Sequence, residues 1–251
     1  MTDTTPLLAL QSLTKGYGGV LAVDSVSFDV RAGTVHGLIG PNGAGKTTTF
    51  NMICGATVAD SGSIRHNGEE LTRAPGWKRA SRGITRTFQN ISLVPEYTVH
   101  ENVFLGSLPS LTKGKRGRAR TQRYDHAWAA VAALLDDFDL SSVASRLAAE
   151  VPAPVQKRVE LARALAAQPS LLLLDEPVAG MTESERSEVL MAIEKVRATA
   201  TILLVEHDMK FVMSACDRLT VLDRGRLIAD GLPDDVRADE EVIKAYLGAE
   251  A

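Results

Sequence analysis

Cysteine is scarce in this 251-residue sequence, and long apolar runs are absent from it. The two cysteines, Cys54 and Cys216, stand far apart with no companion Cys or His at metal-ligand spacing. The sequence therefore has no disulfide framework and fits a reducing compartment, where we expect both thiols to be buried as small apolar groups. No stretch approaches the roughly 18 to 20 apolar residues that span a bilayer. Any membrane role must therefore pass through a partner.

Neither sign of charge dominates the sequence. The formal net charge is -3, from 28 Lys and Arg against 31 Asp and Glu. This balance argues against a surface built to neutralise a phosphate backbone, so nucleic acid is not the expected partner. Residues 1–13 lack a positive region followed by a long apolar run, which excludes a secretory signal, and we expect the chain to stay in the cytoplasm. With 45% apolar residues, the chain can form one domain with an inserted lobe.

The order of the expected elements is mixed α/β. Residues 7–35 predict short strands with turns at Gly18-Gly19 and Ala32-Gly33. Strand and helix then alternate, which implies a parallel sheet. The expected later elements are a buried strand over 34–39, a helix over 46–53 ended by Gly55, helical segments over 101–149, a helix over 156–168, strands over 171–174 and 201–205 with a helix over 184–198 between them, a hairpin over 221–231 around Arg224-Gly225, and a helix-bearing tail over 232–251.

A glycine-rich segment joins the first buried strand to its helix. It satisfies G-x-x-x-x-G-K-[ST], a pattern expected by chance about once in 100 chains of this length. Its glycines allow several backbone N–H groups to point at one phosphate chain beside a helix N-terminus. The lysine then neutralises the β and γ phosphates, and the following threonine hydroxyl completes the coordination of Mg²⁺. The predicted ATP-binding residues are Gly40, Pro41, Asn42, Gly43, Ala44, Gly45, Lys46, Thr47 and Thr48.

Two later strands end in side chains that can act on such a nucleotide. Asp175 and Glu176 follow the strand over 171–174, and His207 follows the strand over 201–205. Parallel strands bring their carboxyl ends to one sheet edge. There we expect Asp175 to hold Mg²⁺ through water and Glu176 to polarise the attacking water. His207 is expected to donate a hydrogen bond to the γ phosphate. Taken alone, the acidic pair is often a capped strand end and the histidine a structural residue; the glycine-rich loop favours the functional interpretation.

In order and spacing, these motifs resemble the nucleotide-binding subunits of ABC transporters over nearly the whole chain. The resemblance implies that Gln89 contributes to catalysis and metal binding and links the γ phosphate to a membrane partner. It also implies that Tyr17 stacks on adenine. From the residues alone, Gln89 is a polar residue near a lobe boundary and Tyr17 is a turn aromatic. The segments that carry the resemblance are GPNGAGKTT at 40–48, RTFQN at 86–90, LLLLDEP at 171–177 and VEHDM at 205–209.

Within that family, the segments at 86–103, 162–181 and 242–248 resemble the larger ATPase subunit of branched-chain amino acid importers. The resemblance implies a motor that uses ATP and Mg²⁺ at the cytoplasmic face of the membrane. The implied partners are transmembrane permease subunits and a second ATPase subunit, either different or a second copy of this chain. Transporters of urea or short amides and lipopolysaccharide exporters have similar ATPases. A soluble ABC ATPase without a transport role and a catalytically weak regulatory subunit are the alternatives.

The chain departs from the family at the signature loop, which serves the ATP bound to the opposite subunit. Pro154 stands where the family has its last glycine, so one N–H donor is missing and φ is fixed near -65°. Pro152 stands where serine is usual. The resemblance therefore implies one weakened composite ATP site. The degenerate loop comprises Pro152, Ala153, Pro154, Val155 and Gln156.

The predicted architecture is one ABC ATPase domain of the α/β class. Its P-loop NTPase (RecA-like) parallel-sheet core spans 1–89 and 160–231, with an N-terminal antiparallel β part, an inserted helical subdomain over 90–159 and a tail over 232–251. A basic run over 113–123 contains no aromatic residue. It favours a solvated loop over a nucleic-acid site or a contact with anionic lipid headgroups.

Overall fold

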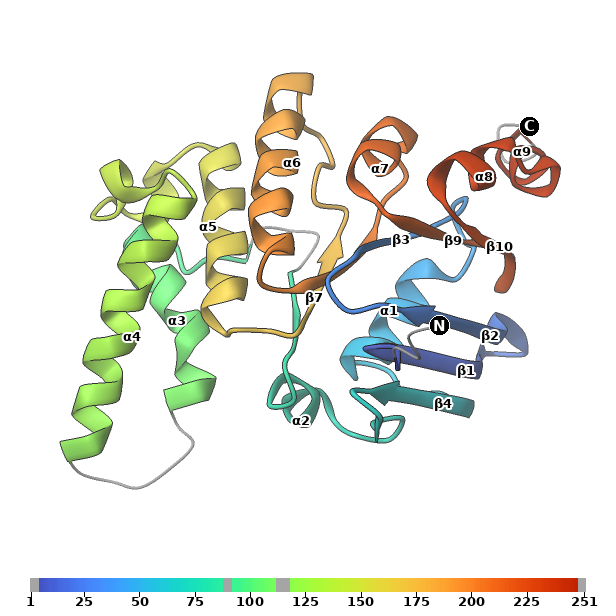
Figure 1. Ribbon diagram of the computed structural model, residues 1–251, viewed down its shortest axis with the longest axis horizontal. Helices are drawn as coiled ribbons and strands as arrows, with labels where there is room; N and C mark the ends of the chain where they lie inside the picture. Colours follow the sequence, from blue (N-terminus) through green and yellow to red (C-terminus); the bar gives the residue numbers. More distant parts are fainter. Residues whose placement is uncertain (1–4, 88–91, 112–117, 248–251) are drawn as a thin grey trace.

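A six-stranded sheet organises the described part of the protein, and helices pack around it (Figure 1). The computed structural model describes residues 5–87, 92–111 and 118–247. Neighbouring strands are parallel, as the sequence predicts, except for the hairpin around Arg224-Gly225. In spatial order the strands are β10 (Arg226–Gly231), β9 (Arg218–Asp223), β3 (Val35–Ile39), β8 (Thr201–Val205), β7 (Leu171–Asp175) and β6 (Ile84–Arg86).

The central strands β3, β7 and β8 are buried along their whole length. Their side chains alternate between two cores. Leu172 and Leu174 join the apolar cluster under α5 (Ala153–Ala166), α6 (Glu183–Arg197) and α7 (Met209–Ala215). Leu171 and Leu173 join the cluster that contains α1 (Lys46–Cys54) and the N-terminal strands. Burial on both faces explains the apolar runs of β7 and β8, whereas β3 also contains the buried His36.

A second, antiparallel sheet covers the other side of α1. Its order is β2 (Val20–Val30), β1 (Leu8–Tyr17), β4 (Ser61–His66) and β5 (Glu69–Glu70). The first two strands were expected, whereas β4, β5, β6 and the short helix α2 (Gly76–Ala80) were not. Strand β4 was not predicted because it contains Gly62, and glycine is unusual inside a strand. Glycine is required there, since its φ is +87° and a Cβ would lie 2.4 Å from the Ser12 carbonyl.

The buried Arg79 of α2 closes the end of α1. Its guanidinium donates to the carbonyls of Met52 and Ile53 in the last turn of α1, and also to those of Thr72 and Ala74. The Met52 and Ile53 carbonyls belong to the end of α1, where helix carbonyls need partners from outside the helix, and the Met52 carbonyl also accepts the N–H of Gly55 at 3.3 Å. A cation there also opposes the negative end of the helix dipole. Arg79 thus ties the residues after β5 to the helix that follows the glycine-rich loop.

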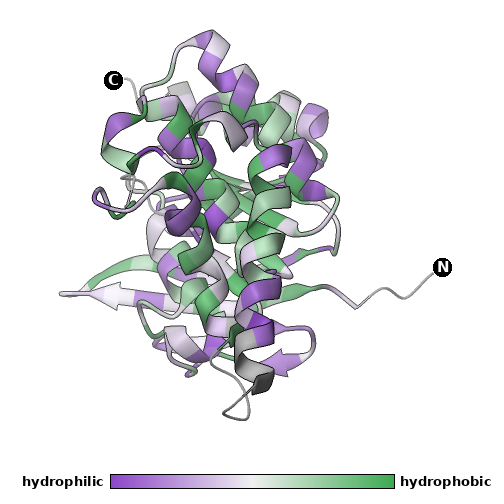
Figure 2. Cartoon of the chain, turned by 90° about the vertical axis from the view of Figure 1, so that its left-hand side faces the viewer, coloured by the Kyte–Doolittle hydropathy of each residue, from purple (hydrophilic) through white to green (hydrophobic). Residues whose placement is uncertain are grey.

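The inserted helices α3 (Val99–Leu111) and α4 (Arg118–Asp137) confirm the expected helical lobe, which faces the viewer in Figure 2. Figure 2 shows hydrophobic residues concentrated between the helices and hydrophilic residues mainly outside. Val131, Leu135 and Phe138 are buried, whereas Trp128 is 47% exposed and packs edge-on against Phe104. Helix α3 packs against α5.

Three sequence expectations need correction or comment. The helix expected over 156–168 begins at Ala153, because proline is compatible with the first turn of a helix, where the missing N–H has no partner. Cys216 is buried as expected, but Cys54 is only half-buried. Helix α5 crosses the boundary drawn between 159 and 160, and the domain limits stay a prediction.

The tail forms α8 (Pro233–Ala238) and α9 (Glu240–Leu247). No helix in the described ranges is long and apolar enough to cross a bilayer.

Candidate nucleotide-binding and hydrolysis site

The glycine-rich loop leaves the carboxyl end of β3 and is confined on two sides. Gly40 has φ +146° and a Cβ there would lie 2.0 Å from the Leu222 carbonyl of β9. Gly45 has φ +99°, and its Cβ would lie 2.4 Å from the Ala22 carbonyl of β2. Gly43 also has positive φ. Positive φ at Gly43 and Gly45, on either side of Ala44, is typical of an anion-binding nest, and the Ala44 N–H donates to the Pro41 carbonyl at 3.2 Å within the loop.

Lys46 is the first residue of α1 and lies at the mouth of this loop. Its ammonium donates to the carbonyls of Gly40 at 2.6 Å and Pro41 at 2.9 Å. Burial lowers the pKa of Lys46, and the charge of Glu176 opposes that shift. Thr47 follows with an exposed side chain and Thr48 with a half-buried one. Lys46 and Thr47 therefore lie beside the glycine-rich loop at the carboxyl edge of the sheet.

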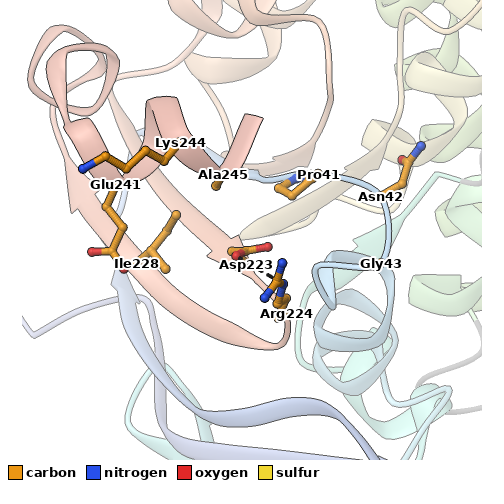
Figure 3. A pocket seen from close by; sticks show the side chains of 9 residues that line it. All are labelled: Pro41, Asn42, Gly43, Asp223, Arg224, Ile228, Glu241, Lys244 and Ala245. Carbon is orange, nitrogen blue, oxygen red and sulfur yellow. Dashed lines mark ion pairs between the residues drawn. The ribbon is translucent and has the colours of Figure 1, made fainter. Parts of the chain in front are cut away.

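The outer face of the loop forms one wall of a cavity of about 410 Å³ (Figure 3). Asp223, at the end of β9, and Arg224, in the turn of the β9–β10 hairpin, lie between the loop and α9 in this view. The N–H of Gly225 in the same turn donates to the Ala44 carbonyl at 3.0 Å. The hairpin thus supports the loop from outside. The cavity is lined by Pro41, Asn42, Gly43, Asp223, Arg224, Ile228, Glu241, Lys244 and Ala245.

Asp175 and Glu176 lie at the carboxyl end of β7, as predicted. The Arg86 guanidinium, at the end of the adjacent β6, donates to Asp175 Oδ2 at 2.6 Å and to Asn51 Oδ1 at 2.6 Å. Arg86 thereby joins Asp175 to helix α1. Sequence reasoning missed this arginine, because nothing in RTFQN shows that three-residue β6 borders β7.

Glu176 has an unusual backbone conformation for a residue with a side chain. Its φ is +45°, and its N–H donates to the Val205 carbonyl at 2.9 Å. A left-handed residue other than glycine costs about 1 kcal/mol or more and often marks a functional site. The conformation turns the chain sharply after β7 while the hydrogen bond keeps Glu176 beside the end of β8.

His207 follows β8 and lies next to Glu176. The distance from His207 Nδ1 to Glu176 Oε1 is 3.9 Å, and to Glu206 Oε2 it is 3.6 Å. Three neighbouring strands thus bring Lys46, Glu176 and His207 to one edge of the sheet. Sequence reasoning missed Glu206 because only the histidine of the VEHDM segment was considered for a role. The signal that could have found Glu206 is a carboxylate that directly follows an apolar strand.

Three other sequence predictions stay predictions. Gln89 lies outside the described residues, as do residues 113–117 of the basic run over 113–123. Tyr17 ends β1 with 51% of its surface exposed, and the Lys15 ammonium lies 5.4 Å from its ring centre. No contact places the Tyr17 ring against the described residues of the glycine-rich loop.

The degenerate signature residues form the start of α5. Pro152 caps the helix, and Ala153 and Pro154 are its first two residues. Pro152 and Ala153 are exposed, while Pro154 and Val155 are half-buried. The Gln156 amide donates to the carbonyls of Ala148 at 3.0 Å and Val151 at 2.9 Å. Gln156 therefore supports the preceding turn, and the exposed surface of this helix start is formed by the residues before it.

The oxygen donors at this edge suit Mg²⁺. The Thr47 hydroxyl and the Asp175 carboxylate are hard ligands of the kind that Mg²⁺ takes from a protein, because this ion keeps several waters and fills its other positions with substrate phosphates. The ion pair with Arg86 uses one oxygen of Asp175. The residues are therefore compatible with a magnesium ion bound together with nucleotide.

Comparison with known proteins agrees with this geometry. Residues 23–179 match the family described as ABC transporter, and residues 226–251 match the family described as branched-chain amino acid ATP-binding cassette transporter. The chain is 39% identical to the high-affinity branched-chain amino acid transport ATP-binding protein BraF of Pseudomonas aeruginosa, and the alignment covers 97% of this chain and 98% of the relative. It is 34% identical to the lipopolysaccharide export system ATP-binding protein LptB of Escherichia coli, over 96% and 97%. A solved ATP-binding cassette of an ABC transporter in its ADP conformation superposes with a TM-score of 0.86 at 29% identity, covering 98% of this chain and 100% of the other.

Proposed function

This chain belongs to the ABC transporter family as an ATP-hydrolysing, ATP-binding subunit, and we propose that it drives the import of branched-chain amino acids or a related small polar solute. Two observations support the substrate class. The relatives at 38–39% identity over almost the whole chain carry branched-chain amino acid transport in their names. The second family match covers residues 226–251, which include β10, α8 and α9. The exporter relative is less similar, at 34% identity.

The observation that carries the mechanism is the delivery of Lys46, Glu176 and His207 to one edge by β3, β7 and β8. In the proposed mechanism the nest over 43–45 and Lys46 bind the phosphates. Glu176 orients a water molecule and accepts its proton as the bond to the γ phosphate breaks. The 3.9 Å between His207 and Glu176 suits an imidazole that contacts the same phosphate. Thr47 and Asp175 would hold Mg²⁺, which supplies positive charge to the phosphate oxygens.

Membrane permease subunits are the expected partners, and we assign their contact to a cleft beside β6. The cleft has a volume of about 780 Å³ and lies between the core and the helical lobe, with walls from α2, β6, α3 and α5. Arg86 and Thr87 line it at the end of β6. A helix end of a permease in this cleft would touch the strand that precedes Gln89 and the arginine that pairs with Asp175. We expect the complex to lie at the cytoplasmic face of the membrane.

A second, different ATPase subunit is the proposed dimer partner. In a homodimer both composite sites would use the Pro154 helix start, which lacks one backbone N–H of the first turn of α5. In a heterodimer one site combines Lys46 and Glu176 of this chain with an intact loop of the partner. The start of α5 therefore favours a heterodimer over a homodimer.

The binding site is tested with Lys46→Ala. We expect loss of ATP binding, because both the charge opposite the phosphates and the bonds to Gly40 and Pro41 are removed. Lys195→Ala, on an exposed face of α6, is the matched control. Titration with a fluorescent ATP analogue measures the affinity. An affinity of Lys46→Ala within about threefold of the parent contradicts the assignment.

The transport role is tested on the native complex. A tagged chain is purified from its own membranes, the co-purifying subunits are identified, and the complex is placed in vesicles with ATP. We expect permease subunits, a second ATPase and ATP-dependent uptake of labelled leucine. Uptake of urea or acetamide without leucine contradicts the substrate proposal but leaves the motor role intact. A complex that contains only copies of this ATPase contradicts the heterodimer.

A further inference from the structure

Glu206 is a buried carboxylate between the two segments that carry Glu176 and His207. Only 1% of its surface is exposed. Its Oε1 accepts the N–H of Val178 at 3.1 Å, from the loop after Glu176. Its Oε2 accepts the N–H of His207 at 2.9 Å and that of Asp208 at 3.3 Å. One side chain thus binds the backbone two residues after Glu176 and the backbone of His207 itself.

The chemistry of this link depends on a carboxylate. Both oxygens act as acceptors toward backbone donors, and hydrogen bonds to a buried carboxylate are shorter and stronger than neutral ones. A glutamine of the same shape offers one acceptor oxygen and an NH₂ group. Whichever way that amide turns, it faces at least one backbone N–H with a donor. Glu206→Gln therefore breaks the link between the two segments while it keeps their volume.

Arg186 of α6 ties the same two segments a second time. Its Nε donates to the Met181 carbonyl at 3.1 Å, and its guanidinium pairs with Asp208. Asp208 in turn caps α7 by accepting the N–H of Phe211 at 3.0 Å. The residues after β7 and the residues after β8 are thus connected at two points, and the exposed turn at Ala179-Gly180 lies between them.

We propose that Glu206 is a positioning residue for ATP hydrolysis, which holds His207 and Glu176 in a fixed relation by binding the backbone on both sides. The inference rests on the roles proposed above for Glu176 and His207. Without the carboxylate, the 3.9 Å approach of the imidazole to Glu176 is no longer enforced. Phosphate binding by the glycine-rich loop does not depend on the link, because the loop is braced by β2 and the β9–β10 hairpin.

The test measures ATPase activity and nucleotide affinity in the assembled transporter. The variants are Glu206→Gln, His207→Ala and the double variant, with Asp217→Asn as the control. Asp217 accepts the Val35 N–H at 2.8 Å at the opposite end of β3, so its loss disturbs the fold without touching the site. We expect Glu206→Gln to lower kcat at least tenfold with the affinity for ATP within threefold of the parent, and Asp217→Asn to leave kcat within twofold.

The double variant separates positioning from a merely structural role. If Glu206 acts through His207, adding Glu206→Gln to His207→Ala lowers kcat less than twofold further. Hydrogen exchange at Val178 and His207 should also speed up in Glu206→Gln. Unchanged kcat in Glu206→Gln, or effects that multiply, overturns the proposal while leaving the site intact. Parent-like kcat in His207→Ala overturns the role of His207 and this inference with it. If Glu206→Gln does not fold, Glu206→Asp, too short to reach both segments, is judged by the same criteria.

Discussion

Mild acid should destabilise this protein through His36, a buried residue of β3. His36 Nε2 lies 2.8 Å from the Thr220 hydroxyl, which donates to Asp230 at 3.2 Å. Because the Thr220 hydroxyl donates its proton to Asp230, it must accept from His36. The neutral imidazole therefore carries its proton on Nε2. The ring also stacks on Phe28 at 5.5 Å. Burial, with the charge of Arg218, lowers the pKa of His36 to about 3.

The sign and size of the effect follow from linkage. The folded pKa lies below the unfolded value of 6.5, so the unfolded chain binds a proton over the range between them. The contribution that neutral His36 makes to the free energy of unfolding is fully present above pH 6.5, and it is lost as the pH falls toward 3. Between pH 7.5 and pH 5.0 the loss from His36 alone is about 2 kcal/mol.

Urea unfolding of the parent and of His36→Gln at the two pH values isolates this contribution. Glutamine keeps a donor toward Thr220 but does not titrate, so other acidic groups cancel in the comparison. We expect the pH-dependent loss to be about 2 kcal/mol smaller in His36→Gln than in the parent. His126→Gln, at an exposed position of α4, should leave the loss unchanged. Equal losses in the parent and His36→Gln would refute the reasoning.

Three further predictions concern the site and the lobe. Glu176→Gln should bind ATP normally but lower kcat of the assembled transporter by about 100-fold or more, because the amide cannot accept a proton; an unchanged kcat moves the catalytic role to His207. The isolated chain should hydrolyse ATP slowly, and Pro154→Gly should raise its rate by about 5- to 150-fold, the value of one buried charge-assisted donor. A parent rate already at the transporter level, or a lower rate with glycine, contradicts this prediction. Gly106→Ala should lower the urea midpoint, at a cost of about 1–3 kcal/mol, because its Cβ would lie 1.9 Å from the Arg163 carbonyl; a parent-like midpoint would show that α3 shifts freely against α5.

The sequence predicted best where local pattern and tertiary role agree. β3, the glycine-rich loop and α1 could be found because a doubly buried strand, glycines with positive φ and a helix that ends at Gly55 each have a local signature. β7 and β8 were equally clear. Their order in one parallel sheet then placed Glu176 and His207 at the same edge without knowledge of any side-chain contact.

The rest of the fold could not be predicted because its determinants are distant in sequence. β6 has three residues and exists through its pairing with β7. The bond from Arg86 to Asp175 depends on that pairing, and the roles of Glu206 and Arg79 depend on backbone groups that only the fold brings near. The start of α5 was misjudged for another reason. Residues 152–155 were assigned to the family's signature loop before a helix that starts at Gln156, whereas the first turn of a helix accepts proline and α5 begins at Ala153.

The braces of the glycine-rich loop have a consequence for biosynthesis. The loop is translated early, but the Leu222 carbonyl and the Gly225 N–H that confine it belong to β9 and the following turn, near the end of the chain. Until β9 has left the ribosome, β3 is an unpaired sheet edge on that side. Contacts this distant in sequence form slowly. The groups that confine the glycine-rich loop from the β9 side are therefore all present only when synthesis is nearly finished.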